Sequence, residues 1–170
     1  IIDYEGNVVS NTYTLNTAYG SGIVAKGTGI LMNNEMDDFS IKPGTPNVYG
    51  LIGSEANKIE SKKSPLSSMS PTIVFKDSKP FLITGSQGGS MIINTVFQEI
   101  LNTIEFNMKL SESNEKSRIH YQWKPSVLLH EGLNKSLIDK LSKIMKLIER
   151  KIGETQSILL ENGDCVLYTS

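Results

Sequence analysis

Apolar residues in the second half of the chain recur at helical spacing. Between 92 and 104 they fall three or four positions apart, which predicts a helix with one apolar face. Residues 133–150 repeat this pattern and predict a second helix. The first set is Ile92, Ile93, Val96, Phe97, Ile100, Leu101 and Ile104, and the second is Leu137, Ile138, Leu141, Ile144, Met145 and Ile148.

Short β-branched or apolar runs, separated by turn residues, predict strands before and after these helices. The runs are residues 7–14, 29–33, 72–75, 81–84, 156–160 and 166–168. Lys76-Asp77-Ser78-Lys79 predicts one hairpin turn, and Asn162-Gly163 predicts another that closes the chain. Residues 29–33 are apolar enough for a buried strand. Strands, then helices, then strands favour an α+β fold with helices packed on largely antiparallel sheets.

Composition and charge exclude several classes of protein. The chain has 170 residues with 17 Lys and Arg against 18 Asp and Glu, and this balance argues against a nucleic-acid partner or an anionic membrane surface. Cys165 is the only cysteine, which excludes an internal disulfide and a cysteine-based zinc site. No apolar run approaches the 18 or more residues of a membrane span, so none is expected in this chain.

Three segments could form a binding or catalytic site. Gly85-Ser86-Gln87-Gly88-Gly89-Ser90 lies between a predicted strand and a predicted helix, where free N–H groups suit an anion or an oxyanion; a plain tight turn is the alternative. Residues 33–39 (NNEMDDF) could hold an ammonium group or a cation, or form a solvated acidic turn. Residues 65–71 (PLSSMSP) offer hydroxyls between prolines, which suits a small polar ligand; a serine-rich loop is the commoner explanation.

The remaining polar features are less specific. Residues 43–63 carry several Pro and Gly and predict a long surface loop, a length that is usually functional. His120 and His130 have no nucleophile motif beside them, so we expect core or surface histidines.

Taken together, five segments resemble the gamma-glutamyltranspeptidase family in order and spacing over nearly the whole chain. They are residues 1–20 (IIDYEGNVVSNTYTLNTAYG), 31–39 (LMNNEMDDF), 47–51 (NVYGL), 65–71 and 85–89 (GSQGG). The match is to the small, C-terminal subunit. The resemblance implies an N-terminal-nucleophile hydrolase with an αββα sandwich, of which this chain forms the small-subunit half. It also implies γ-glutamyl transfer from glutathione and related compounds to water, amino acids or peptides, through a γ-glutamyl–threonine ester.

The resemblance further implies that a precursor cuts itself and frees an N-terminal threonine, whose own α-amine activates its hydroxyl. The family's Thr-x-His-x-Ser signature would precede Ile1 and is absent here. We therefore expect residues 1–170 to be a single domain, truncated at the N-terminus and, for lack of an Asp-Pro-Arg-type stretch after Ser170, at the C-terminus. We expect this chain alone to be inactive. Its expected partner is the large subunit of the same precursor, which supplies an arginine for the substrate.

Site residues follow from the resemblance position by position. Thr14 is expected to hydrogen-bond the nucleophile, and the backbone N–H groups of Gly88 and Gly89 are expected to form the oxyanion hole. The residues expected to bind the glutamyl group are Asn16, Glu35, Asp38, Ser67, Ser68 and, on a lid loop from Pro43 to about Ser54, Tyr49. No metal and no cofactor are expected, and the family suggests a periplasmic or secreted protein. Gln87 and Met91 replace the family's usual Pro and Arg, which changes the rigidity of the glycine turn.

Two other functions stay open at this point. A chain without its threonine could be a non-catalytic γ-glutamyl-binding protein. A branch of the family acts instead on poly-γ-glutamate, as a transpeptidase or hydrolase. The segment Asn34-Glu35-Met36-Asp37-Asp38-Phe39 and the lid tyrosine favour the glutathione type.

Overall fold

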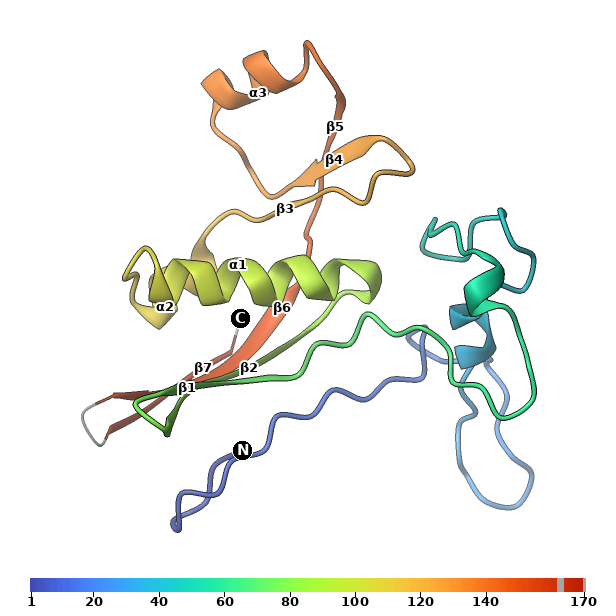
Figure 1. Ribbon diagram of the computed structural model, residues 1–170, viewed down its shortest axis with the longest axis horizontal. Helices are drawn as coiled ribbons and strands as arrows, with labels where there is room; N and C mark the ends of the chain where they lie inside the picture. Colours follow the sequence, from blue (N-terminus) through green and yellow to red (C-terminus); the bar gives the residue numbers. More distant parts are fainter. Residues whose placement is uncertain (162–163, 170) are drawn as a thin grey trace. The chain divides into compact units, whose positions relative to one another are not determined.

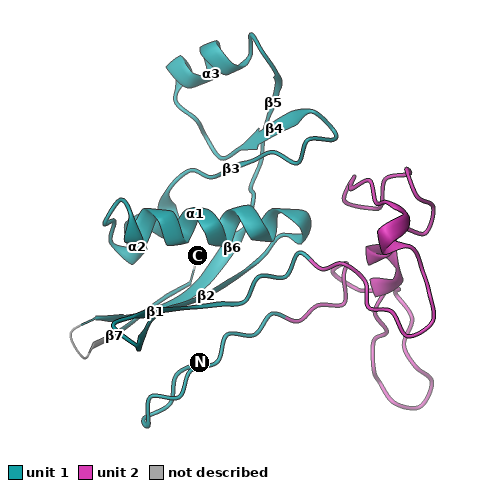
Figure 2. Ribbon diagram, viewed as in Figure 1, with its two compact units in different colours: residues 1–12, 68–170 teal, residues 13–67 magenta. Residues whose placement is uncertain are grey.

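A computed structural model of the protein describes residues 1–161 and 164–169. The chain divides into two compact units, residues 13–67 and residues 1–12 with 68–170 (Figure 2). No finding tests the expectation of a single domain, which stays a prediction.

The larger unit contains a four-stranded sheet in the order β1-β2-β6-β7, with every neighbouring pair antiparallel. The strands are β1 (Thr72–Lys76), β2 (Lys79–Gln87), β6 (Glu154–Glu161) and β7 (Asp164–Thr169). The hairpin predicted between β1 and β2 is confirmed. Its turn residues Asp77 and Ser78 have φ of 51° and 63°, as a two-residue hairpin turn requires. Strands β6 and β7 also pair as predicted, while Asn162 and Gly163 lie outside the described residues.

Helix α1 (Ile92–Ile104) lies across one face of this sheet, with the short α2 (Leu110–Glu115) beyond it (Figure 1). The core cluster consists of Leu82, Leu110 and Leu159. The bounds predicted for α1 are confirmed, but its buried face differs from the apolar stripe. Thr95, Glu99 and Thr103 are buried, whereas Ile93 and Phe97 are 53% and 56% exposed.

The buried polar side of α1 has partners in the sheet. Glu99 is 1% exposed and accepts hydrogen bonds from Thr84 on β2 and, at 2.7 Å, from Ser157 on β6. These two hydroxyls point toward the helix because residues 82, 84 and 86 of β2 share one face of the sheet, as alternation along a strand requires. The helix therefore docks on the sheet through polar side chains at its middle and apolar ones near its start.

A second, three-stranded sheet has the order β3-β4-β5. Its strands are β3 (Ile119–His120), β4 (Val127–His130) and β5 (Lys146–Glu149), and α3 (Lys135–Leu141) connects β4 to β5. The prediction of one helix over 133–150 is therefore wrong beyond Leu141. The apolar residues of 144–148 fit a strand as well as a helix, and parallel pairing with β4 decides between the two.

The smaller unit contains short 3-10 helices, η1 (Glu35–Asp38) and η2 (Glu55–Asn57), and isolated bridges. The predicted buried strand at 29–33 is wrong, because Leu31 makes one bridge to Val24 and Ile30 is 61% exposed. In the larger unit, the strand predicted at 7–14 is also wrong. There Val8 makes one bridge to Ile2, and no ladder continues through the described residues. Residues 43–63 form the predicted surface loop.

Candidate functional site

The acidic segment forms a 3-10 helix, η1, that places Glu35 and Asp38 together. Residues three apart eclipse each other in this kind of helix. Burial raises the pKa of Glu35 above its ordinary value, and the hydrogen bond to Asp38 and the charge of Asp38 raise it further. Burial also raises the pKa of Asp38, against the hydrogen bond from Glu35. The two carboxyl groups therefore hold a proton more tightly than isolated ones, and a cation brought to them would release it.

One oxygen of this pair lacks a hydrogen-bond partner among the described residues. Glu35 Oε1 is buried and accepts no hydrogen bond from the described residues. An unpaired buried oxygen is costly, and an ammonium donor would satisfy it. Asp37 points elsewhere, because its Oδ2 accepts the backbone N–H of Val48 at 3.0 Å.

Tyr49 connects the expected lid loop to the segment that contains Thr14 and Asn16. Its hydroxyl donates to the carbonyl oxygen of Asn16 at 2.7 Å. Burial raises the pKa of Tyr49, followed by the negative charges of Asp38, Glu35 and Asp37. Asn16 has a φ of 76°, and its N–H donates to Thr14 Oγ1 at 2.8 Å. The smaller unit thus contains six of the predicted site residues, the five above and Ser67.

Asn57 is a residue of this region that sequence reasoning missed. Its Nδ2 donates to the carbonyl oxygen of Asp38 at 2.7 Å, and its Oδ1 accepts the N–H of Leu66 at 3.0 Å. It therefore joins η1 to the residue just before Ser67. A single amide in a loop has no periodic signal, so only the resemblance could have pointed to it.

The two predicted serines are neighbours in the sequence but belong to different units. Ser67 is exposed and belongs to the smaller unit, whereas Ser68 is half-buried and belongs to the larger. The Ser68 carbonyl oxygen accepts the hydroxyl of Ser70 at 3.0 Å. Their roles in binding a carboxylate stay predictions.

The glycine turn lies in the larger unit, where β2 ends and the 3-10 helix η3 (Gly89–Met91) leads into α1. Gly88 and Gly89 have φ of 138° and 58°. A Cβ at Gly88 would lie 2.8 Å from the carbonyl oxygen of Ile152, so the turn requires glycine there. Among the described residues, the N–H groups of both glycines donate to no carbonyl oxygen, which leaves two adjacent donors for a ligand.

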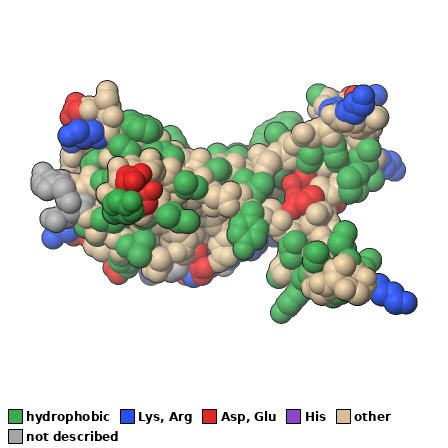
Figure 3. Space-filling model, turned by 90° about the horizontal axis from the view of Figure 1, so that it is seen from below, with side chains coloured by type: hydrophobic (Ala, Val, Ile, Leu, Met, Phe, Trp, Pro, Cys, Tyr) green, Lys and Arg blue, Asp and Glu red, His purple; other side chains and the backbone are tan. Residues whose placement is uncertain are grey.

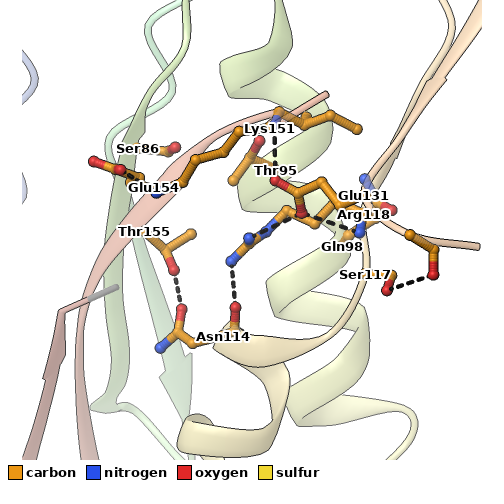
Figure 4. A network of polar contacts seen from close by, with 12 residues as sticks. Ser86, Thr95, Gln98, Asn114, Ser117, Arg118, Glu131, Lys151, Glu154 and Thr155 are labelled. Atoms are coloured by element: carbon orange, nitrogen blue, oxygen red, sulfur yellow. Dashed lines mark hydrogen bonds and ion pairs between the residues drawn. The ribbon is translucent and has the colours of Figure 1, made fainter. Parts of the chain in front are cut away.

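A buried ion pair supports the segment behind this turn (Figure 4). Arg118 and Glu131 lie 3.3 Å apart, with side chains 7% and 18% exposed. The other carboxylate oxygen of Glu131 accepts the N–H of Ile152 at 2.7 Å, and the carbonyl oxygen of Ile152 faces Gly88. The ion pair therefore holds the backbone against which the turn packs.

Both histidines are buried, as expected for core histidines: each is 3% exposed. Within the described residues, no group of three or more His, Cys, Asp or Glu could hold a metal ion. No helix there is long and apolar enough to cross a membrane.

The α+β fold, with its helices packed on an antiparallel sheet, matches that of N-terminal-nucleophile hydrolases. Residues 1–169 match the family described as Gamma-glutamyltranspeptidase, and the chain belongs to that family. A solved structure of Helicobacter pylori gamma-glutamyltranspeptidase has a TM-score of 0.93 and 48% identity, covering 100% of this chain and 95% of that one. The enzyme from Pseudomonas nitroreducens has a TM-score of 0.94 and 39% identity, over 99% and 91%.

The glutathione hydrolase proenzyme of Escherichia coli K12 is 50% identical over 163 residues, which are 94% of this chain and 28% of that protein. The chain thus spans about 28% of this curated relative. The resemblance and the fold class predicted from the sequence are confirmed, because the family match and the structural similarity extend over nearly the whole chain.

Proposed function

We propose that this chain is the small-subunit part of an enzyme that transfers γ-glutamyl groups from glutathione and related donors to water, amino acids or peptides. The observation that carries the proposal is the Glu35–Asp38 pair, with its raised pKa values and the unpaired buried oxygen of Glu35. A donor's α-ammonium binds the ionised form of the pair, Asp38 being the main partner. Asn16, Ser67 and Ser68 bind the same end of the glutamyl group, and Tyr49 closes the loop over it.

The reaction then uses the residues of the turn. The hydroxyl of the precursor's threonine, helped by Thr14, adds to the γ-carbonyl carbon of the donor and gives its proton to the threonine α-amine. The N–H groups of Gly88 and Gly89 stabilise the oxyanion, worth roughly 3 kcal/mol per donor in comparable enzymes. The C–N bond breaks, the leaving amine takes the proton, and water or an amine then attacks the threonine ester. No metal or cofactor takes part in this scheme.

The partner that we propose is the large subunit of the same proenzyme. Relatives of this chain are made as proenzymes, and the chain covers 28% of the Escherichia coli protein. Large apolar side chains are exposed on and just after α1: Ile93, Phe97, Ile104 and Phe106. Hydrophobic side chains also spread over the face seen in Figure 3. Exposed apolar surface of this kind marks protein interfaces. By resemblance, we further propose a periplasmic or secreted enzyme.

The test uses the full precursor, including the threonine and the large subunit. Hydrolysis of a chromogenic γ-glutamyl anilide is measured for the wild type, for Asp38→Asn and for Asp139→Asn. Asp139 is an exposed residue of α3 and serves as the matched control. We expect activity that is lost in the first variant and kept in the second. A wild-type precursor that neither processes itself nor releases the anilide would contradict the proposal and favour a γ-glutamyl-binding protein.

A further inference from the structure

We infer that Gln122 is a positioning residue for the oxyanion hole, acting through Ser90 on the Gly88–Gly89 turn. This inference rests on the proposed function and adds to it a residue outside the five segments that carry the family resemblance. All of these residues belong to the larger unit.

The glycine turn needs contacts from other residues, because its own backbone can adopt many conformations. Two successive glycines at positive φ have wide conformational freedom and no side chains to fix them. Inside the turn, the N–H of Met91 donates to the carbonyl oxygen of Gly88 at 3.1 Å. Gln87 also lacks the fixed φ that proline would have, and its side chain bonds to Glu154 at an exposed position. Exposed contacts of this kind hold a backbone only weakly.

Gln122 supplies a better-protected contact. The hydroxyl of Ser90, the residue after Gly89, donates to Gln122 Oε1 at 3.0 Å. Gln122 Nε2 donates to the carbonyl oxygen of Lys124 at 3.3 Å, which orients the amide so that its oxygen faces Ser90.

His120 fixes Gln122 from the other side. Its Nε2 lies 2.9 Å from the same Oε1 and donates to it in the tautomer that carries the proton on Nε2. In that tautomer Nδ1 is an acceptor, and its contact with the Asn94 amide on α1, 3.0 Å away, is a hydrogen bond when the amide nitrogen faces the ring. The imidazole is 3% exposed, so water does not compete for these contacts. The result is a chain of contacts from α1 through β3 to η3 that ends on the residue beside the two N–H donors.

The consequence is a specific kinetic signature. Without the bond to Gln122, Ser90 is released and the N–H groups of the two preceding glycines lose their fixed direction. An oxyanion exists only in the transition state, so misdirected donors lower kcat. The residues proposed to bind the glutamyl group, Glu35 and Asp38, belong to the smaller unit and are not members of this chain of hydrogen bonds, so we expect KM to stay nearly constant.

The experiment measures kcat and KM for a γ-glutamyl anilide in the full enzyme, with rates divided by the amount of processed small subunit. The variants are Gln122→Met, which keeps the side-chain length, Ser90→Ala, Ser90→Thr, and the double variant Ser90→Ala with Gln122→Met. The matched control is Gln98→Met. Gln98 joins α1 to β3 through the N–H and carbonyl of Ile119 at 3.0 and 2.9 Å but does not contact the turn.

We expect Gln122→Met and Ser90→Ala each to lower kcat by about 10-fold or more, with KM within about threefold of wild type. The double variant should lose little more than either single variant, because both changes remove the same contact. Ser90→Thr, which keeps the hydroxyl, should recover most of kcat. Gln98→Met should lower thermal stability while kcat stays near the wild-type value.

Three results would overturn the inference: kcat values within twofold of wild type in both single variants, an equal fall in Gln98→Met, or no recovery in Ser90→Thr. If Gln122→Met yields no processed enzyme, Ser90→Ala, which deletes one hydroxyl, decides. An inactive wild type would instead overturn the proposed function itself.

Discussion

The carboxylate of Asp37 accepts the backbone N–H of Val48 at 3.0 Å, while its neighbour Asp38 shares a hydrogen bond with Glu35. The two adjacent carboxylates of η1 thus have different hydrogen-bond partners. Asp37 holds the loop that contains Tyr49, and Asp38 belongs to the pair that we propose for the substrate ammonium.

Asp38→Ala should therefore harm substrate use far more than Asp37→Ala. Removing one partner of a hydrogen-bonded charge pair costs about 2–5 kcal/mol, a loss of roughly 30-fold to several thousand-fold in kcat/KM. Asp37→Ala removes one bond to a loop backbone, worth about 1 kcal/mol, and should act mainly on KM. Steady-state kinetics on a γ-glutamyl anilide give both values. Equal losses of kcat/KM in the two variants would contradict the assignment of Asp38 as the carboxylate that binds the substrate ammonium.

Glu99 should make the stability of the protein depend on pH. Burial raises its pKa in the folded state, against the hydrogen bonds from Thr84 and Ser157 and the charge of Arg118. The folded protein therefore binds a proton more tightly than the unfolded chain. The stability that this proton contributes is fully present below the unfolded pKa and is lost as pH rises through the folded one.

Glu99→Gln removes this titration. We expect the variant to gain stability relative to wild type at pH 8 and not at pH 4, measured by chemical denaturation of the processed enzyme. Glu105→Gln, an exposed change just after α1, is the control and should leave the pH dependence unchanged. If the pH dependence of stability is the same in Glu99→Gln and in wild type, folding does not shift the pKa of this carboxyl.

Gly88→Ala should be more damaging than Gly44→Ala. Both positions have positive φ, of 138° and 80°, but a Cβ at Gly44 meets nothing within 4 Å. The control therefore measures backbone strain alone, about 1–2 kcal/mol. At Gly88 the clash with the Ile152 carbonyl adds to that strain and moves an oxyanion donor. Melting temperature and kcat should both fall further for Gly88→Ala, and similar values for the two variants would contradict the close packing described for the turn.

Ile93 and Phe97 should matter for assembly and little for the folding of this chain. They lie one turn apart on α1 and are more than half exposed, so the double change to serine removes few internal contacts. We expect a lower yield of the complex with the large subunit, measured by size-exclusion chromatography. Lys143→Ser, at an exposed position after α3, controls for a general effect of surface change. If the yield of the complex is undiminished, the large subunit does not bind through Ile93 and Phe97.

The sequence predicts those parts of the fold that depend on residues close together in the chain. The bounds of α1 follow from apolar spacing, and the β1–β2 hairpin follows from its turn residues. The buried side of α1 does not follow, because Glu99 is buried against Thr84 on β2 and Ser157 on β6, which are distant in the sequence. The strand β5 was missed for the same reason, since its pairing with β4 outweighs the local helical pattern.

The site shows the same limit. Glu35, Asp38, Gly88 and Gly89 could be named because whole segments resemble a known family, and their individual roles stay predictions. Asn57 and Gln122 are single amides, and their positions depend on contacts with the carbonyl oxygen of Asp38 and the hydroxyl of Ser90, 19 and 32 residues away in the sequence. No sequence pattern predicts such contacts.

The outward apolar residues of α1 have a consequence for how the protein is made. Two separately synthesised subunits would have to find each other by diffusion while this surface faced water and other chains. A single precursor replaces that encounter by a tethered one, with an effective concentration of the order of millimolar for a short flexible linker. If this chain is cut from a precursor after folding, as we propose, the cleaved bond lies between parts that are already in place. The exposed apolar residues of α1 would then be covered by the partner before the chain can aggregate.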